Sequence, residues 1–426
     1  MPFKKLIYKL KAFLYAALAG LQFNLVGQLG GNEILAVADS FSLNSWKKLY
    51  HDIPDIKKIN IAYFTFFLFQ LLSDIINHSE SHNYIRGWAA IIMAIITLNF
   101  LSKILLKSFD SIIFYFIGGT LYLIVFKPQP DYSIGDIGES MGTFKFWLVP
   151  ILNNLVLIIS WFIMGKSKRS GSLVSGLLIF YGLFCMAFDA RSNGVFFIIT
   201  GLIFLFKDQL INYSRQKAIV LLVVFFAAFQ GLYVIYVKEA MSGKIGGEHS
   251  KEQLRRVNYS YNPLYLLFTG RTELFVAMVA IEDKPIFGFG SWAPDPTGKY
   301  LVMVLEMQDE DQQIASLLKS DANPLIIPAH SIIMGAWLDG GIGAFLSIMF
   351  ILILFLKRCF YLLSSKDIIH SKYFPILIFF MLNAFWTFLF SPLPHIKDSL
   401  PIMIAFVLVM HQKVKDQKYI QPNNKM

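Results

Sequence analysis

Long apolar runs, bounded by polar or basic clusters, dominate the pattern of this chain. A membrane-spanning helix needs about 20 mainly apolar residues, so each such run predicts one crossing of a bilayer. We expect these helices at 60–77, 87–101, 109–126, 146–164, 171–188, 194–206, 218–237, 331–356, 372–390 and 398–411. The pattern therefore predicts an all-α polytopic membrane protein.

The first forty-five residues are harder to interpret, because residues 13–29 can cross once whereas Glu33 and Asp39 interrupt the next stretch. Lysine and arginine collect on cytoplasmic loops of membrane proteins. The basic clusters between the spans can all share the cytoplasmic side only if this segment crosses twice. We therefore expect a tight hairpin turning near Gly30 and Gly31, which gives about twelve transmembrane helices with both termini inside.

This topology divides the chain into three parts. Residues 1–237 hold transmembrane helices 1–9, residues 238–329 form a large periplasmic loop, and residues 330–426 hold helices 10–12 and a cytoplasmic tail. Short helices are expected in the loop, one of them at 272–282, lying along the membrane surface or capping a cavity. Its apolar stripe consists of Leu274, Phe275, Met278 and Ile281.

Composition and charge support a membrane protein. Hydrophobic residues make up 56% of the chain and charged residues 15%, whereas soluble domains have roughly 45–50% and about 25%. The net charge of +10 would suggest nucleic acid in a soluble protein, but the cytoplasmic placement of basic residues accounts for it here. Cys185 and Cys359 fall near opposite faces in this topology, so we expect neither a disulfide nor a metal cluster from them.

Three basic residues stand at edges of spans on the same predicted side: Arg191, Arg271 and His330. A guanidinium binds two phosphate oxygens at once and stays charged when partly buried, which suits a lipid diphosphate. An imidazole can accept a proton from a sugar hydroxyl. Taken singly, the residues favour plainer roles, with arginines that snorkel or pair with Asp189 or Glu273 and a histidine that bonds a loop carbonyl.

One motif carries a resemblance to a known family. His330-Ser331, nine further residues and then Gly341 resemble the His-(Asn/Ser)-x9-Gly signature that opens a late helix in O-antigen ligases and the related O-antigen and exopolysaccharide polymerases. Arg271, with the Lys-Pro-Ile-Phe-Gly-Phe-Gly segment at 284–290, looks like part of that family's large outer loop.

The resemblance implies a metal-independent glycosyltransferase of the bacterial inner membrane, without a cofactor and with its active site facing the periplasm. An acceptor sugar hydroxyl would attack the anomeric carbon of a glycan linked to undecaprenyl diphosphate. Arg191, which matches the family's arginine after a mid-chain span, and Arg271 would hold the leaving diphosphate, while His330 would orient or deprotonate the acceptor.

The acceptor is lipid A core in ligases and another lipid-linked repeat unit in polymerases. Ala344 stands where the ligase signature has glycine, threonine or tyrosine. The resemblance therefore leaves the choice between ligase and polymerase open.

Other residues give weaker indications. Arg255 and Arg256, with tyrosines nearby, could bind a glycan, and Trp292 or Tyr300 could stack on a sugar, although plain surface and core roles explain them equally well. The acidic run at 309–311 resembles the metal motif of nucleotide-sugar transferases. Those enzymes work in the cytoplasm and this run is predicted outside, so we expect a solvated loop.

Two other classes of function remain. A flippase or transporter for lipid-linked oligosaccharide could have as many spans, but transporters place their sites near the membrane midplane. Here the candidate residues gather at the outer edge, which favours transfer chemistry. In a structural or assembly protein without chemistry, Arg191, Arg271 and His330 would be unrelated in space.

Overall fold

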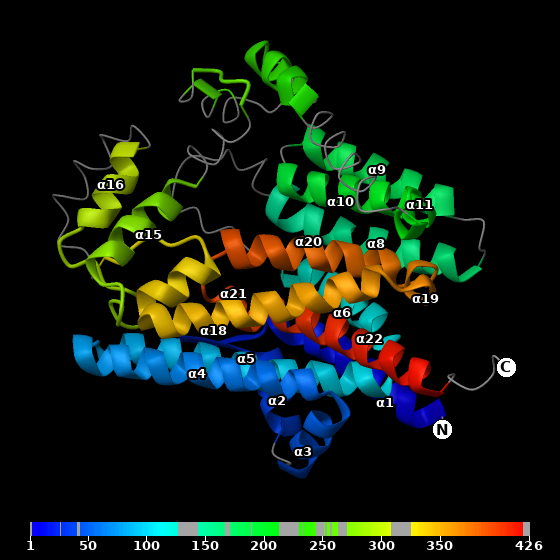
Figure 1. The fold of residues 1–426 in the computed structure, drawn as a ribbon, viewed down its shortest axis with the longest axis horizontal. Coiled ribbons are helices and arrows are strands. Elements are labelled where there is room, and N and C mark those ends of the chain that lie inside the picture. Colours follow the sequence, from blue (N-terminus) through cyan, green and yellow to red (C-terminus); the bar gives the residue numbers. More distant parts are fainter. Residues whose placement is uncertain are drawn as a thin grey trace.

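The computed structural model is mainly helical. It describes residues 2–25, 27–40, 43–126, 144–166, 171–188, 190–212, 271–307 and 325–420, with short stretches between 230 and 262. The long helices run side by side along the longest axis of the molecule (Figure 1). We call the end that carries residues 271–307 the loop end, and the opposite end, where both termini lie, the basic end.

Seventeen α-helices and one two-stranded sheet are placed in these residues. The helices are α1 (Pro2–Ala17), α2 (Gly31–Ser40), α3 (Leu43–Asp52), α4 (Pro54–Asn77), α5 (Ser81–Lys107), α6 (Ser111–Phe126), α8 (Val149–Lys166), α9 (Gly171–Ala187), α10 (Arg191–Leu205), α11 (Lys207–Asn212), α15 (Thr272–Asp283), α16 (Lys299–Met307), α18 (Ile332–Leu363), α19 (Lys366–Ile369), α20 (Phe374–Phe390), α21 (His395–Asp398) and α22 (Leu400–Ile420). The strands are β1 (Gln22–Leu25) and β2 (Gly27–Gly30).

Four helical segments are long and apolar enough to cross a membrane: Pro54–Asn77, Ser81–Lys107, Lys145–Lys166 and Ile332–Leu363. At about 1.5 Å per residue, α4 extends about 36 Å, more than the hydrocarbon core of about 30 Å. The apolar helices α6, α9, α10 and α20 are shorter. The mainly helical fold is thus confirmed and has four candidate membrane-spanning helices in the described residues, whereas about twelve crossings stay a prediction. Most of the expected span at 218–237 lies outside the described residues.

The first half of α22 forms the centre of the bundle. All of its residues from Leu400 to Met410 are buried, as expected for a helix that is hydrophobic on every side. It packs against α5, α18 and α20. Large apolar side chains instead face outward on peripheral helices, for example Phe180 at 70% and Leu173 at 63% exposure on α9. Such an inverted surface suits contact with lipid chains.

The N-terminal segment differs from the expected hairpin. β1 and β2 pair antiparallel and turn between Leu25 and Gly27, while Gly31 begins α2 instead of ending a turn. Residues 22–25 alternate polar and apolar side chains, a strand period that competes with a second helix. α2 packs beside α1, where Lys11 pairs with Asp39. The chain therefore turns back as expected, but through strands and a ten-residue helix.

The loop end confirms a predicted helix but with a different buried face. α15 covers Thr272–Asp283 and packs against α16 and α18. Met278, a member of the predicted apolar stripe, is 51% exposed, whereas Ile281 of the same stripe is buried. The buried face instead consists of Val276, Ala277, Ala280 and Ile281. Small alanines lie on this face because α18 approaches closely.

A break inside α18 positions the loop end. Gly341 has φ +69° and ψ −164°, outside helical geometry. The backbone of the preceding loop enters this break: Phe289 N–H donates to the Leu338 carbonyl at 2.6 Å, and Ile342 N–H to the Ile286 carbonyl at 3.1 Å. A Cβ at Gly341 would stand 1.9 Å from that Ile286 oxygen. Glycine is therefore required where the loop joins the helix.

Candidate functional site

Two of the three predicted site residues meet at the loop end. Arg271 directly precedes α15, and His330 lies just before α18. Between them, Glu273 Oε1 is 3.4 Å from His330 Nδ1. The Arg271 guanidinium lies over the rings of Trp386 and Phe390, with its Cζ 5.7 and 5.9 Å from their centroids. Glu273 interacts electrostatically with His330 and Arg271 and so links them into one group.

The charges of this group set its chemistry. Burial raises the pKa of Glu273, but the His330 hydrogen bond and the charges of His330 and Arg271 outweigh it and hold this pKa below its usual range. Burial lowers the pKa of Arg271 and Glu273 partly offsets the change, while a guanidinium stays charged at neutral pH. An ionised Glu273 accepts a proton-bearing Nδ1, which leaves His330 Nε2 as the basic nitrogen.

Arg191 lies nearby in the fold but makes different contacts. It begins α10, and its Cζ is 5.5 Å from the centroid of the Tyr236 ring. Further along α10, Phe196 packs edge-on against Trp386, with centroids 5.6 Å apart. Trp386 is also the ring beneath Arg271. Arg271 therefore contacts α20 directly, whereas for Arg191 only the helix that it begins contacts α20.

A cavity of about 1350 Å³ opens beside the Glu273–His330 pair. Its walls are mainly apolar and come from α5, α16, α21, the β-hairpin and residues 325–330. Small-molecule sites usually have about 300–1,000 Å³, so this one can hold a large ligand. Of the described residues, His330 and Glu273 line the cavity whereas Arg191 and Arg271 do not. The Glu273–His330 pair therefore stands between the cavity and Arg271.

One wall of the cavity is polar and includes Trp292. This residue has φ +62°, uncommon for a bulky side chain and costly unless held in place. Asp339 Oδ2 accepts its backbone N–H at 3.2 Å and the Gln70 amide at 3.4 Å. The Arg86 guanidinium covers the Trp292 ring, with its Cζ 4.4 Å from the centroid. Gln70, Arg86, Trp292 and Asp339 all line the cavity.

A buried carboxylate ties this wall to α4. Asp74 accepts the backbone N–H of Ser291 at 2.6 Å with one oxygen. Its other oxygen accepts the Ser291 hydroxyl at 2.7 Å and the Trp88 indole N–H at 2.8 Å. Hydrogen bonds to a charged acceptor are stronger than neutral ones. They fix the residue next to Trp292 and so hold its unusual backbone in place.

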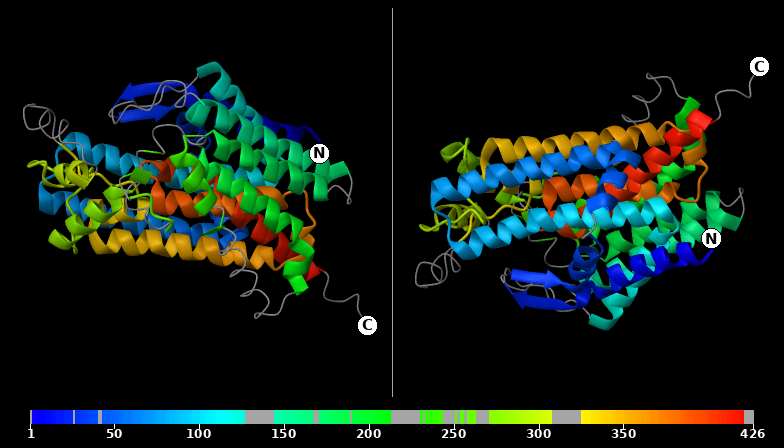
Figure 2. Two further views of the ribbon diagram at one scale, coloured as in Figure 1. Left: turned by 90° about the horizontal axis from the view of Figure 1, so that it is seen from above. Right: turned by 90° about the horizontal axis from the view of Figure 1, so that it is seen from below.

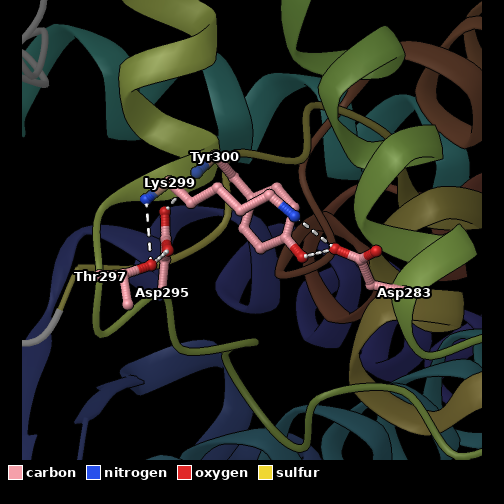
Figure 3. Close-up of polar contacts among 5 residues, drawn as sticks. All are labelled: Asp283, Asp295, Thr297, Lys299 and Tyr300. Carbon is pink, nitrogen blue, oxygen red and sulfur yellow. Dashed lines mark hydrogen bonds and ion pairs between the residues drawn. The ribbon is translucent and has the colours of Figure 1, made fainter.

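Another part of the cavity wall is formed by α16, which polar contacts hold in place (Figure 3). Buried Asp295 caps the helix by accepting the backbone N–H groups of Tyr300 at 2.9 Å and Leu301 at 3.1 Å. At the end of α15, Asp283 accepts hydrogen bonds from Lys299 Nζ at 2.6 Å and Tyr300 Oη at 2.5 Å. These bonds lower the pKa of Asp283. α16 contributes Leu301, Val304 and Leu305 to the cavity.

The remaining sequence candidates have different outcomes. Tyr300 is only 6% exposed and bonded to Asp283, so it supports α16 and cannot stack on a sugar. Arg255 is exposed next to a small core that includes Tyr233 and Tyr236, and its role in glycan binding stays a prediction. Arg256 and residues 309–311 lie outside the described residues. Within the described parts of the chain, no group of three or more His, Cys, Asp or Glu side chains could hold a metal ion.

Sequence reasoning missed several polar residues of this site, namely Gln70, Asp74, Arg86, Glu273 as a histidine partner, and Asp339. Asp74 and Asp339 lie inside apolar runs. An acidic residue within a membrane span is costly and usually functional, and that signal could have identified them. The contact of Glu273 with His330 joins residues 57 positions apart in sequence, and no sequence pattern indicates it.

Comparisons of the chain with protein-family models, with curated proteins and with solved structures found no match. A functional conclusion therefore depends on the geometry at the loop end and on the resemblance carried by the His330 motif.

Proposed function

We propose that this protein is a membrane glycosyltransferase of the O-antigen ligase and polymerase type. It would transfer a glycan from undecaprenyl diphosphate to a saccharide acceptor, either another lipid-linked repeat unit or lipid A core. The observation that carries the proposal is the Glu273–His330 pair, 3.4 Å apart, set between a charged arginine and a cavity of about 1350 Å³. The transfer needs a base, here His330, that lies between a group that binds the diphosphate and a cavity that holds the acceptor.

The residues divide the reaction between them. Glu273 fixes the imidazole of His330 through Nδ1, so that Nε2 takes the proton of the acceptor hydroxyl. The acceptor oxygen forms its bond to the anomeric carbon while the bond from that carbon to the diphosphate oxygen breaks. Arg271, together with Arg191, neutralises the negative charge that develops on the departing diphosphate. No metal or cofactor takes part in this scheme.

The cavity suits the saccharide acceptor. Asp339 and Gln70 offer an oxygen acceptor and an amide to sugar hydroxyls, and the indole of Trp292 offers an apolar surface to a sugar ring. Arg86 supplies a cation for an acidic sugar or a phosphate substituent. Donor and acceptor would then approach His330 from opposite sides, the donor from Arg271 and the acceptor from the cavity.

The proposed topology has about twelve crossings, with the loop end in the periplasm and the basic end in the cytoplasm of a bacterial inner-membrane protein. Both termini lie at the basic end (Figure 1), as an even number of crossings requires. Seen from above and from below, the β-hairpin lies beside the bundle rather than across it (Figure 2). Residues 22–30 would therefore lie at the side of the protein.

The experiment that tests the proposal is transfer with purified protein, a lipid-linked oligosaccharide donor and an acceptor saccharide, followed by gel and mass analysis of the glycan. Wild-type protein should form a new glycosidic bond, and His330→Ala should not. His395→Ala is a matched control, because this exposed histidine lines the same cavity but is not paired with Glu273. A flippase would move the donor across vesicles without a new bond, and that result would replace the proposal.

In cells, a profile of surface glycans separates the two acceptors. Loss of a polymerase leaves single repeat units on the core, whereas loss of a ligase leaves bare core and accumulated lipid-linked polymer.

A further inference from the structure

A second cavity, of about 410 Å³, lies at the basic end. It is formed by the start of α4, the last turns of α18 and the second half of α22, at the far end of the bundle from His330. Its charged lining residues are Asp55, Lys58, Arg358 and Lys415. None of them belongs to the proposed transfer site, so the cavity needs an explanation of its own.

Arg358 is the residue around which this cavity is built. Its side chain is only 19% exposed, and its Nε donates to Asp55 Oδ2 at 2.7 Å. The terminal Nη1 and Nη2 groups donate to no other residue in the part of the chain that the structure describes. Asp55 also accepts Lys58 Nζ at 2.9 Å. The carboxylate thus fixes the direction of the guanidinium and leaves its outer N–H groups available.

The cavity has more positive than negative charge. Three cations, Lys58, Arg358 and Lys415, surround one carboxylate, Asp55, and these lining residues sum to a formal +2. The floor is the His411 ring, which packs edge-on against Tyr361 with centroids 4.8 Å apart. Excess positive charge in a partly enclosed site is unfavourable unless an anion compensates it.

A phosphate group fits these donors. A planar guanidinium binds two phosphate oxygens at once, and the flanking ammonium groups add point charges. Basic pockets between transmembrane helices on the cytoplasmic side bind the head groups of anionic lipids. A soluble phosphate compound presents the same chemistry to the same donors.

We propose that this cavity is a phosphate-binding site, with Arg358 as its fork and Lys58 and Lys415 at its sides. The proposal is independent of the transfer reaction, because it concerns the other end of the bundle and can be tested without a glycan substrate.

The test follows thermal unfolding of the purified full-length protein in two arms. The first arm adds inorganic phosphate in detergent and compares it with chloride at equal ionic strength. The second arm compares nanodiscs of phosphatidylcholine with nanodiscs that also contain phosphatidylglycerol. A ligand of the folded state raises the unfolding temperature in a saturable way. A rise in the first arm identifies a soluble phosphate site, and a rise in the second arm alone identifies a lipid site.

Variants decide whether the cavity is responsible. Arg358→Gln should weaken binding at least about tenfold. Lys357→Gln, which removes the same charge from an exposed neighbouring position, should leave binding unchanged. Asp55→Asn keeps an oxygen for Arg358 Nε and removes only the acid, so it should lower basal stability while binding stays equal or becomes tighter. If Asp55 and Arg358 formed only a structural ion pair, both variants would lower basal stability and neither would change the stabilisation by phosphate.

If Arg358→Gln does not fold, Lys415→Gln takes its place against the same control, with a smaller loss of binding expected. The proposal is overturned if neither arm shows saturable stabilisation. It is equally overturned if Lys357→Gln reduces the stabilisation as much as the cavity variant does.

Discussion

Glu273→Gln is the most informative perturbation of the proposed transfer site. The substitution keeps the size of the side chain and an oxygen that can accept His330 Nδ1–H, but removes the negative charge that lies 3.4 Å from that nitrogen. A hydrogen bond to a charged group contributes about 1.5–3 kcal/mol and a neutral one about 0.5–1.5 kcal/mol. The difference of about 1–2 kcal/mol should appear in the transition state, where the imidazole becomes positively charged.

At about 1.4 kcal/mol per tenfold, this difference lowers kcat about five- to thirtyfold. The KM for the lipid donor should change little, since Arg191 and Arg271 remain. The measurement is the initial rate of glycan transfer by purified protein at saturating donor and acceptor. Glu282→Gln is the matched control, because Glu282 lies on the same helix and is exposed.

The pH dependence gives a second readout. Glu273 has a pKa below its ordinary value of 4.5 in the folded protein. Its contribution to stability is therefore fully present above about pH 4.5 and is lost only as the pH falls through the lower folded value. Near neutral pH, Glu273 therefore stays ionised and its contribution to stability is constant. In Glu273→Gln this part of the loss of stability at acidic pH should be absent, and thermal unfolding at a series of pH values measures it.

The reasoning would be refuted by a Glu273→Gln protein with the wild-type rate and the wild-type loss of stability at acidic pH. Glu273 would then be a structural partner of Arg271, and the base would have to be sought elsewhere in the cavity.

Three further predictions concern other parts of the molecule. Arg191→Ala and Arg271→Ala should each abolish transfer while membrane insertion is retained, as judged by gel filtration of the purified variants, and the lysine variants should recover only part of the activity because the bidentate fork is lost. Gly341→Ala should destabilise the protein by about 1–3 kcal/mol in thermal unfolding, whereas Gly176→Ala, with open space around its Cβ, should not. Trp292→Ala should raise the KM for the acceptor several-fold and leave the KM for the donor unchanged, and equal changes in both would place Trp292 outside the acceptor site.

The apolar runs predicted most of the helices because a backbone surrounded by apolar groups must satisfy its own hydrogen bonds, which a helix does within one segment. The helix expected at 87–101 appears within α5, and the one expected at 372–390 matches α20 closely. Residues 22–30 were the exception. The polar–apolar alternation that indicates a strand covers only residues 22–25, which is too short to distinguish a strand from the end of a helix.

The site could be predicted only where a residue has an unusual chemistry for its position. Arg271 and His330 were found in this way and do meet at Glu273. Asp74 and Asp339 are also unusual for their positions, because each is an acidic residue in an otherwise apolar helix. The left-handed backbone of Trp292 and its cover by Arg86 arise from tertiary packing, which local sequence does not encode.

The break at Gly341 has a consequence for biogenesis and for protein engineering. Non-helical backbone within a bilayer is tolerated only where protein covers it, and here the covering groups are the carbonyl of Ile286 and the amide of Phe289. We therefore expect α18 to reach its final form only together with the loop that precedes it. In a chimaeric protein, residues 284–293 and the first turns of α18 should be exchanged together. Exchange of one segment alone would disrupt the backbone hydrogen bonds that join it to the other.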